Sequence, residues 1–349
     1  MSDKLKFGLV GAGAIAQAYA QAFVTSNEAE LVAVADVVPA AAETMAHAFG
    51  CKPYTSYRAM ANAAKLDAVI VCTPPVAHTD VSLYFLQRKT PVLCEKPLSI
   101  NAATARVVIE TAKRSGVKFA MASKFRYVDD VIKAKAIVTA GLLGDIILFE
   151  NAFTSRVDMS DRWNAKPEIS GGGVLIDNGT HSVDLVRYFL GPVADVQVVE
   201  GKRSQALEVE DTVRIFVRSA AGVLGSIDLS WSINKEQESY INIYGSHGTL
   251  WVGWKESKYR QSGARDWVVF GKGYNKVQAF RSNIDNFARA ICGEEALLTT
   301  ADDALACVEV IEAAYADLRR NHWVAVGTPL AAASVEPAAQ TETMAGAIA

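Results

Sequence analysis

Three side chains near the middle of the chain have the types and spacing that proton transfer requires. His181 and Asp184 follow Asp177 by four and seven residues, so on a helix over 175–190 all three share one face. A histidine held by carboxylates can exchange a proton near neutral pH, as the oxidation of a secondary alcohol requires. Periodicity alone favours a plainer interpretation, a helix whose polar face is solvated. The choice therefore depends on the rest of the chain.

The chain begins with the pattern of a dinucleotide-binding turn. A predicted strand, Leu5–Val10, runs directly into Gly-Ala-Gly-Ala-Ile-Ala at 11–16 and then into a helical pattern. Glycines at such a turn let the backbone approach a pyrophosphate, which binds at the N-terminus of the helix. Ala16 stands at the third position, which serves helix packing and tolerates alanine. The expected cofactor contacts in this turn are Gly11, Gly13, Ala14 and Ile15.

Asp36 determines which dinucleotide is expected. It follows a second predicted strand, Glu30–Ala35, about twenty residues beyond the turn, where this fingerprint places an acid for the ribose hydroxyls. No Lys or Arg follows until Lys52, so no nearby cation suits the 2′-phosphate of NADP. We therefore expect NAD rather than NADP. The alternative interpretation, that Asp36 only caps the next helix, fits its place after a strand less well.

Two polar patches follow further predicted strands, at 66–71 and at 91–94. Both patches lie at the carboxyl ends of parallel strands, the edge where open α/β sheets bind ligands. An ammonium at Lys96, held by the stiff turn at Pro97, could stabilise an alkoxide or hydrogen-bond a hydroxyl. If either patch stood alone, the favoured interpretation would be an ordinary surface lysine at Lys96 or a helix-start residue at His78. The expected cofactor contacts at this edge are Thr73, Pro74, His78, Glu95 and Lys96.

Together these motifs resemble those of the Gfo/Idh/MocA family of oxidoreductases, named after glucose–fructose oxidoreductase, inositol dehydrogenase and a rhizopine catabolism protein. The shared motifs are GAGAIA, T-P-P-x-x-H, E-K-P, G-G-G-x-L-x-D-x-G-x-H-x-x-D and the helix start at 299–304. The resemblance covers the chain to about residue 329. It implies a catalytic trio of Lys96, Asp177 and His181, and a cis bond before Pro97. It also implies NAD(P)-dependent hydride transfer to or from a secondary hydroxyl of a sugar, cyclitol, sugar acid or nucleotide sugar.

The chain departs from the family pattern at two places. Pro75 stands where relatives commonly have Asn, which puts a side-chain cofactor contact there in doubt. Lys124 begins Lys-Phe-Arg-Tyr where relatives often have Asn-Arg-Arg-Phe, so we expect an extra cation in the substrate pocket. The segment 154–170 could fold over the cleft, and its arginines could bind an anion or simply be solvated. The candidate substrate contacts are Lys124, Arg126, Tyr127, Arg156, Arg162, Trp163, Asn164 and Asp184.

The predicted elements that position these residues are arranged in two different ways along the chain. Strand and helix patterns alternate over 1–122, which predicts a doubly wound parallel sheet of the Rossmann type. Beyond Ser123 a helix at 128–140 and a strand at 146–153 precede the helix that carries His181. Strand patterns then follow one another at 193–199, 212–218, 223–231, 240–244, 249–252 and 267–270. They predict a large, mostly antiparallel open sheet.

The overall prediction is an α/β protein with two domains, 1–122 and 123–330. The second domain ends with helices predicted at 277–292 and 301–320, and it holds the substrate and the subunit contacts. The Ala-rich stretch 331–349 has no periodicity and is interpreted as a flexible tail. All six tryptophans follow residue 160, so a face of the second sheet could pair two or four copies of the chain.

Composition excludes several other partners. Lys plus Arg is 35 against 38 for Asp plus Glu, a net charge of −3, which disfavours nucleic acid or an acidic membrane surface. No apolar run is long enough to span a bilayer, and the N-terminus has no signal-peptide pattern. Five dispersed cysteines without C-x-x-C are typical of reduced thiols in the cytoplasm. No Cys/His cluster indicates a metal site, so we expect none.

Two other functions stay open from the sequence. One is an NAD-dependent glycosidase that oxidises and re-reduces its sugar without net turnover of the cofactor. The other is a regulator that only senses the cofactor, a role that would not need Lys96, Asp177 or His181. The presence of all three favours an enzyme.

Overall fold

A six-stranded parallel sheet forms the first part of the molecule. The computed structural model describes residues 4–320 and 323, so the predicted tail lies outside the described residues. The strand order is β3-β2-β1-β4-β5-β6, a doubly wound arrangement. The strands are β1 (Leu5–Val10), β2 (Ala29–Ala35), β3 (Lys52–Tyr54), β4 (Ala68–Val71), β5 (Val92–Cys94) and β6 (Phe119–Met121). The predicted Rossmann sheet is confirmed.

Helices cover both faces of this sheet, as parallel strands require. They are α1 (Ala14–Val24), α2 (Pro39–Phe49), α3 (Tyr57–Ala63), α4 (His78–Gln87) and α5 (Ala102–Ser115). Two short 3₁₀ turns, η1 (Pro75–Ala77) and η2 (Lys124–Tyr127), follow β4 and β6. Edge strand β3 was missed from the sequence because it is three residues long and contains Pro53, which lowers strand propensity.

An eight-stranded sheet forms the second part, in the order β14-β13-β12-β11-β7-β10-β9-β8. Only β7 and β10 pair in parallel, so the predicted mostly antiparallel sheet is confirmed. The strands are β7 (Ile146–Thr154), β8 (Val193–Glu200), β9 (Thr212–Ser219), β10 (Leu224–Ser230), β11 (Ser239–Gly245), β12 (Gly248–Gly253), β13 (Ser257–Gln261) and β14 (Val268–Gly271). The sequence did not predict β13, whose Ser-Lys-Tyr-Arg-Gln lacks the apolar alternation of a buried strand.

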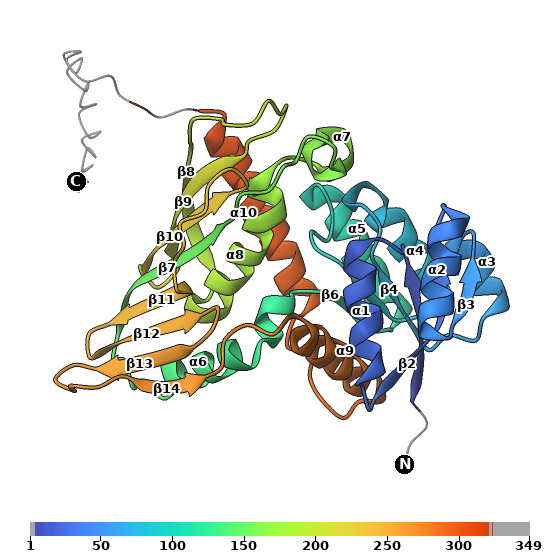
Figure 1. Ribbon diagram of the computed structural model, residues 1–349, viewed down its shortest axis with the longest axis horizontal. Coiled ribbons are helices and arrows are strands. Elements are labelled where there is room, and N and C mark those ends of the chain that lie inside the picture. Colours follow the sequence, from blue (N-terminus) through green and yellow to red (C-terminus); the bar gives the residue numbers. More distant parts are fainter. Residues whose placement is uncertain (1–3, 321–322, 324–349) are drawn as a thin grey trace, which may run out of the picture.

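A layer of helices covers the face of the large sheet that is turned toward the first part of the molecule (Figure 1). The layer holds α6 (Asp129–Thr139), α8 (Val174–Leu190) and α10 (Ala301–Leu318), and α8 and α10 pack against each other and the large sheet. The short elements η3 (Trp163–Ala165) and α7 (Pro167–Ser170) come just before α8, and α7 packs against η1 of the first part. No described helix covers the other face of the large sheet (Figure 1).

Helix α9 (Lys276–Cys292) returns to the first sheet. It packs against α1, and its Phe280 and Phe287 are fully buried in the same core as Phe7 of β1. The chain therefore passes from the first sheet to the second, returns to the first in α9, and packs against the second again in α10. The division at residue 122 stays a prediction, since a helix from the second stretch completes the core of the first.

Two findings bear on the partners predicted from composition. No helix in the described part of the chain is long and apolar enough to cross a membrane. Residues 4–320 and 323 also contain no group of three or more His, Cys, Asp or Glu side chains placed to hold a metal ion.

Candidate active site

Lys96 and Asp177 meet between the two sheets. Lys96 follows β5 and precedes Pro97 in a cis peptide bond, as the family resemblance implied. Its ammonium forms an ion pair with the carboxylate of Asp177 and also donates a hydrogen bond to the Asp177 main-chain oxygen at 3.0 Å. Asp177 lies in the first turn of α8. This pair therefore joins the ligand edge of the parallel sheet to the helix predicted to carry the proton-transfer group.

His181 lies one turn further along α8 and is 8% exposed. Its ring meets the edge of the Phe125 ring at a centroid distance of 5.0 Å, with Phe153 at 6.4 Å. Burial lowers the pKa of the imidazole well below its usual value, and the charges of Lys96 and Lys124 lower this pKa further. At pH 7 the ring is therefore neutral and can accept a proton.

The expected pair of carboxylates around His181 is not present. The carboxylate of Asp177 bonds Lys96, and the carboxylate of Asp184 bonds Arg126. Helical spacing correctly placed the three residues on one side of α8. However, it could not show that cations from other elements would engage both acids.

Glu95 is a buried acid between the cofactor turn and the catalytic loop. Its Oε1 accepts a hydrogen bond from the hydroxyl of Tyr19 in α1 at 2.8 Å, and its Oε2 accepts one from the Lys96 N–H at 2.9 Å. Burial raises the pKa of Glu95, while the charge of Lys96 and the Tyr19 hydrogen bond oppose that rise. The sequence did not predict this role for Tyr19, because it occupies one of the apolar positions of the α1 pattern.

The three glycines before α8 allow close packing at its first turn. A Cβ at Gly172 would lie 1.9 Å from the hydroxyl oxygen of Tyr315 in α10, so no larger residue fits. The Gly173 and Leu175 N–H groups both donate to Oε1 of Glu210 at 3.0 Å, and Tyr315 donates to the same atom at 2.8 Å. Glu210 thus caps α8 from a distant segment and fixes the helix that carries Asp177 and His181.

The glycine-rich turn has the features that a bound dinucleotide needs. Gly11 has φ +99°, and a Cβ there would lie 2.8 Å from the carbonyl oxygen of Cys72. Gly13 precedes α1, which has no side-chain cap, and a Cβ at Gly13 would meet nothing within 4 Å. Free N–H groups at a helix start facing open space suit a pyrophosphate. Ala14 and Ile15 are the first two residues of α1.

Asp36 and Thr73 flank this turn. Asp36 follows β2, and its Oδ2 accepts a hydrogen bond from the Ala12 N–H at 2.7 Å. Thr73 follows β4, and its buried hydroxyl has no partner among the described residues. An unpaired buried hydroxyl next to the turn suits a ligand that brings its own polar groups. The residues at this edge therefore fit NAD.

The side chain of His78, which was predicted as a cofactor contact, has partners within the protein. The side chain is buried, with Nδ1 at 2.7 Å from the Pro97 carbonyl oxygen and Nε2 at 2.7 Å from that of Thr73. Its physical effect is to tie the loop after β4 to the loop that carries Lys96. Pro74 lies in the first of these loops, directly before η1.

Arg126, Tyr127 and Asp184 were predicted as substrate contacts, and in the structure their side chains are buried and have partners within the protein. Arg126 is 4% exposed and pairs with the carboxylates of Asp184 and Asp303. The hydroxyl of Tyr127 donates to Oδ1 of Asn286 in α9 at 3.0 Å. These side chains are engaged inside the fold because α9 and α10, from the end of the chain, bring their partners.

Lys124 does lie near His181. Its Nζ is 5.1 Å from the centroid of the Phe125 ring, the ring that touches His181, and 5.7 Å from that of Phe280. Burial lowers the pKa of Lys124 to about 8, with Lys96 and Lys276 lowering it further and Glu95 opposing. The predicted extra cation is thus present next to His181.

The remaining substrate candidates lie in the segment between β7 and α8. Arg156 and Arg162 are exposed, and no described contact joins either to Lys96, Asp177 or His181. Trp163 and Asn164 lie in η3, just before α7, which reaches the first part of the molecule. The segment therefore contacts the first part of the molecule through α7, while its place over the cleft and the roles of its side chains stay predictions.

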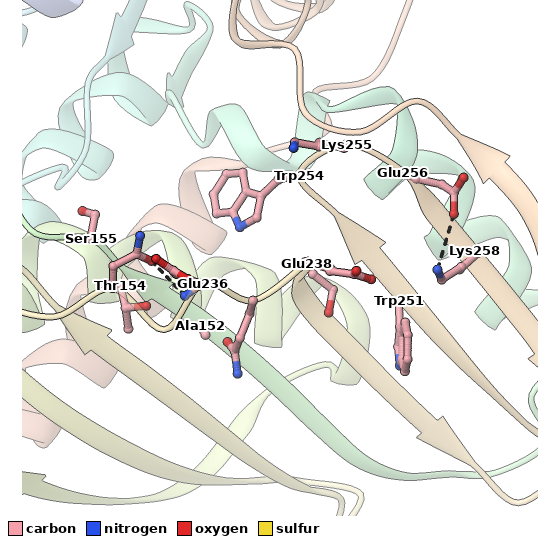
Figure 2. A pocket seen from close by; sticks show the side chains of 13 residues that line it. Ala152, Thr154, Ser155, Glu236, Glu238, Trp251, Trp254, Lys255, Glu256 and Lys258 are labelled. Carbon is pink, nitrogen blue, oxygen red and sulfur yellow. Dashed lines mark hydrogen bonds and ion pairs between the residues drawn. The ribbon is translucent and has the colours of Figure 1, made fainter.

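A cavity of about 820 Å³ opens on the uncovered face of the large sheet. Ala152 and Thr154 line it, and the intervening Phe153 points the opposite way, toward His181. Figure 2 shows the indole of Trp254 at one side of this cavity. Trp254 also contacts Tyr240 at a centroid distance of 4.6 Å and Phe153 at 6.2 Å. Aromatic side chains therefore lie between this cavity and His181.

Comparison with protein families agrees with this geometry. The model for "Oxidoreductase family, NAD-binding Rossmann fold" matches residues 5–123, and the model for "GFO/IDH/MocA C-terminal domain" matches residues 131–251. The chain belongs to the Gfo/Idh/MocA family. It is therefore an oxidoreductase whose Rossmann domain binds NAD.

Members of the Gfo/Idh/MocA family match nearly the whole chain. Inositol 2-dehydrogenase of Rhizobium meliloti (strain 1021) is 26% identical, over 92% of this chain and 99% of the relative. The rhizopine catabolism protein MocA of Rhizobium meliloti is 27% identical, over 91% and 96%. Among solved structures, the WlbA dehydrogenase of Bordetella pertussis with NADH and UDP-GlcNAcA has the same fold. Its TM-score is 0.78 at 24% identity, over 91% of this chain and 97% of that one.

Proposed function

We propose that this Gfo/Idh/MocA protein transfers a hydride between NAD and a secondary hydroxyl or keto carbon of a sugar-like substrate. We further propose that Lys96, Asp177 and His181 handle the proton. The observation that carries the proposal is the Lys96–Asp177 ion pair beside a neutral, buried His181 at the ligand edge of the Rossmann sheet. Relatives named as inositol, glucose-6-phosphate and D-glucoside dehydrogenases support a sugar or cyclitol as the substrate class.

Each member of the trio has a separate task. The neutral imidazole of His181 accepts the hydroxyl proton during oxidation and returns it during reduction. The Lys96 ammonium donates a hydrogen bond to the same oxygen and stabilises the charge that develops on it. Asp177 holds the Lys96 side chain in place through their ion pair. When bound, NAD supplies the hydride acceptor, the part of the chemistry that no side chain can perform.

The residues around the glycine-rich turn hold the cofactor in this proposal. The N–H groups from Gly13 to Ile15 bind the pyrophosphate, and Asp36 accepts hydrogen bonds from the ribose hydroxyls. A carboxylate at position 36 repels the 2′-phosphate of NADP, which supports the preference for NAD.

The test combines a substrate panel with variants of the trio. Aldoses, uronic acids, inositols and nucleotide sugars are incubated with NAD, and NADH absorbance is followed. His181→Ala and Lys96→Ala should each lower turnover on the best substrate by about 100-fold or more, since each removes a group used in proton transfer. The affinity for NAD should change little. His47→Ala, at an exposed histidine far from the cleft, is the matched control. Near-normal turnover in either trio variant contradicts the assignment.

Product analysis separates this function from an NAD-dependent glycosidase. Release of an aglycone without net NADH would select the glycosidase, and accumulation of a keto sugar with NADH selects the dehydrogenase. The same Lys96, Asp177 and His181 would serve either reaction.

We also infer a homo-oligomer, a dimer or tetramer, formed through the uncovered face of the large sheet. Leu148, Phe216 and Trp251 on that face are only half-buried, while the residue that follows each of them, on the other face, is buried. A second copy of the chain would cover these apolar side chains. A monomeric mass in sedimentation at micromolar concentration would contradict this. The cytoplasmic location stays a prediction from the free, dispersed cysteines.

A further inference from the structure

Lys124, in the candidate active site, has no hydrogen-bond or ion-pair partner among the described residues. It begins η2, which packs against both α8 and α9. Its ammonium contacts the faces of Phe125 and Phe280, and it forms no hydrogen bond or ion pair with any described residue. Arg126, two residues on, has two carboxylates and a carbonyl oxygen as partners. Of these two neighbouring cations, only Arg126 has carboxylate partners among the described residues.

The two carboxylates near Lys124, those of Asp177 and Glu95, already have other partners. The carboxylate of Asp177 bonds Lys96, and both oxygens of Glu95 accept hydrogen bonds, from Tyr19 and from the main chain of Lys96. Lys276, at the start of α9, adds a further positive charge nearby. A partly buried ammonium without a close counter-ion is destabilised by lost hydration, and a bound anion would offset that loss.

The ring of Phe125 relates Lys124 to the reacting centre. The centroid of the Phe125 ring lies 5.0 Å from the centroid of the His181 imidazole. The Lys124 ammonium lies 5.1 Å from the same Phe125 centroid. A hydroxyl bound by His181 and Lys96 and an anionic group bound by Lys124 would therefore belong to one small molecule.

We propose that Lys124 binds a carboxylate of the substrate, and that this enzyme acts on a sugar acid in preference to the corresponding neutral sugar or cyclitol. This rests on the proposed function and narrows its substrate class. A single ammonium suits a carboxylate, because phosphate sites usually combine several donors, such as arginines or a helix N-terminus. Arg156 and Arg162, the other candidates for an anion, are exposed and have no contact with the trio.

The experiment compares matched acid and neutral substrates. Uronates and aldonates are paired with the corresponding aldoses and alditols, and kcat and KM are measured for the wild type, Lys124→Met, Lys124→Arg and the control Lys202→Met at an exposed site. Lys124→Met should lower kcat/KM for acids by about 10- to 100-fold, the loss expected for a hydrogen bond to a charged group. The effect should be mainly on KM. The loss for neutral substrates, compared on the pH plateau, should be much smaller, and the KM for NAD should not rise with the KM for acids.

Two further readouts distinguish binding from folding. Lys124→Arg keeps the charge and should recover much of the acid preference, and the thermal midpoint shows that each variant folds. In the wild type the KM for acids should rise above pH 8, as the Lys124 ammonium loses its proton among Glu95, Lys96, Asp177, His181 and Lys276. The KM for neutral substrates should not follow this change.

Three outcomes would overturn the inference. The first is a wild type with a higher kcat/KM for neutral sugars than for acids. The second is an equal loss of kcat/KM for acids and neutral substrates in Lys124→Met. The third is a Lys124→Met variant in which the KM for NAD rises and the KM for the substrate does not. Turnover of neutral substrates alone overturns this inference and leaves the proposed function intact. If neither acids nor neutral substrates give NADH, both the inference and the proposed function are overturned.

Discussion

The chemistry of His181 is set by the rings and cations around it. Carboxylate neighbours, as the helical spacing suggested, would have raised the pKa of the imidazole. The structure instead surrounds the ring with Phe125 and Phe153 and places the ammoniums of Lys96 and Lys124 nearby, so its pKa lies well below the usual value. The ring is thus held in the neutral form that can accept a proton from an alcohol.

A pH profile of alcohol oxidation tests this at the scale of the residue. Because burial and two nearby cations lower the pKa of His181, the imidazole stays unprotonated as the pH falls through 6.5. We expect kcat/KM on a neutral substrate to hold its plateau there and to decline only at clearly lower pH. Lys124→Met removes one cation, so the acid limb should move upward. An acid limb at or above pH 6.5 in the wild type would contradict this assignment.

At the scale of elements, loops at strand ends assemble the site. His78 links the loop after β4 to the loop after β5, and Glu95 links that second loop to α1 through Tyr19. Glu210 caps α8 from the segment before β9. Each of these contacts joins segments whose directions are set by regular strands and helices, so small shifts of the elements would separate Lys96 from Asp177.

The two glycines of the cofactor turn should respond differently to a methyl group. Gly11→Ala forces a Cβ against the Cys72 carbonyl at φ +99°, so it should lower the free energy of unfolding by about 1–3 kcal/mol. Gly13→Ala meets nothing in the protein and should unfold nearly like the wild type, yet bind NAD more weakly, because the methyl occupies the open space at the start of α1. Urea unfolding and NAD titration measure the two effects. Unchanged NAD affinity in Gly13→Ala would contradict this position for the pyrophosphate.

At the scale of the whole molecule, the end of the chain closes the structure. Helix α9 completes the core of the Rossmann sheet with Phe280 and Phe287, while α10 supplies Asp303 to Arg126. Arg126 also bonds Asp184 of α8, so this buried network joins the end of the parallel sheet to the helix layer (Figure 1). Stability and catalytic geometry therefore depend on the same residues.

Asp184 offers a test of this network. Asp184→Asn leaves Arg126 with a weakened partner inside the protein, so the free energy of unfolding should fall by about 3 kcal/mol, the lower end of the cost for breaking a buried ion pair. The double variant Arg126→Met/Asp184→Leu removes both charges and should lose less. Urea unfolding measures both. The KM for the substrate should not change in Asp184→Asn, and a selective rise in KM would restore Asp184 as a substrate contact.

The sequence by itself determined the elements and the chemistry that they carry. Apolar runs and glycine placement predicted the Rossmann strands, the cofactor turn and the antiparallel sheet, because these depend on residues close together in the chain. Only strands β3 and β13 were not predicted, since β3 has three residues and contains a proline, while β13 lacks apolar alternation. The pairing of Lys96 with Asp177 came from the family resemblance.

The tertiary structure decided the environment of each side chain. His181 and Asp184 share a helix face, yet one remains beside the cleft and the other bonds Arg126. Lys124 and Arg126 are two residues apart, yet only Arg126 finds carboxylate partners. The physical reason is that local spacing fixes which face a residue occupies. Burial, charge and pKa depend on partners that arrive from far along the chain.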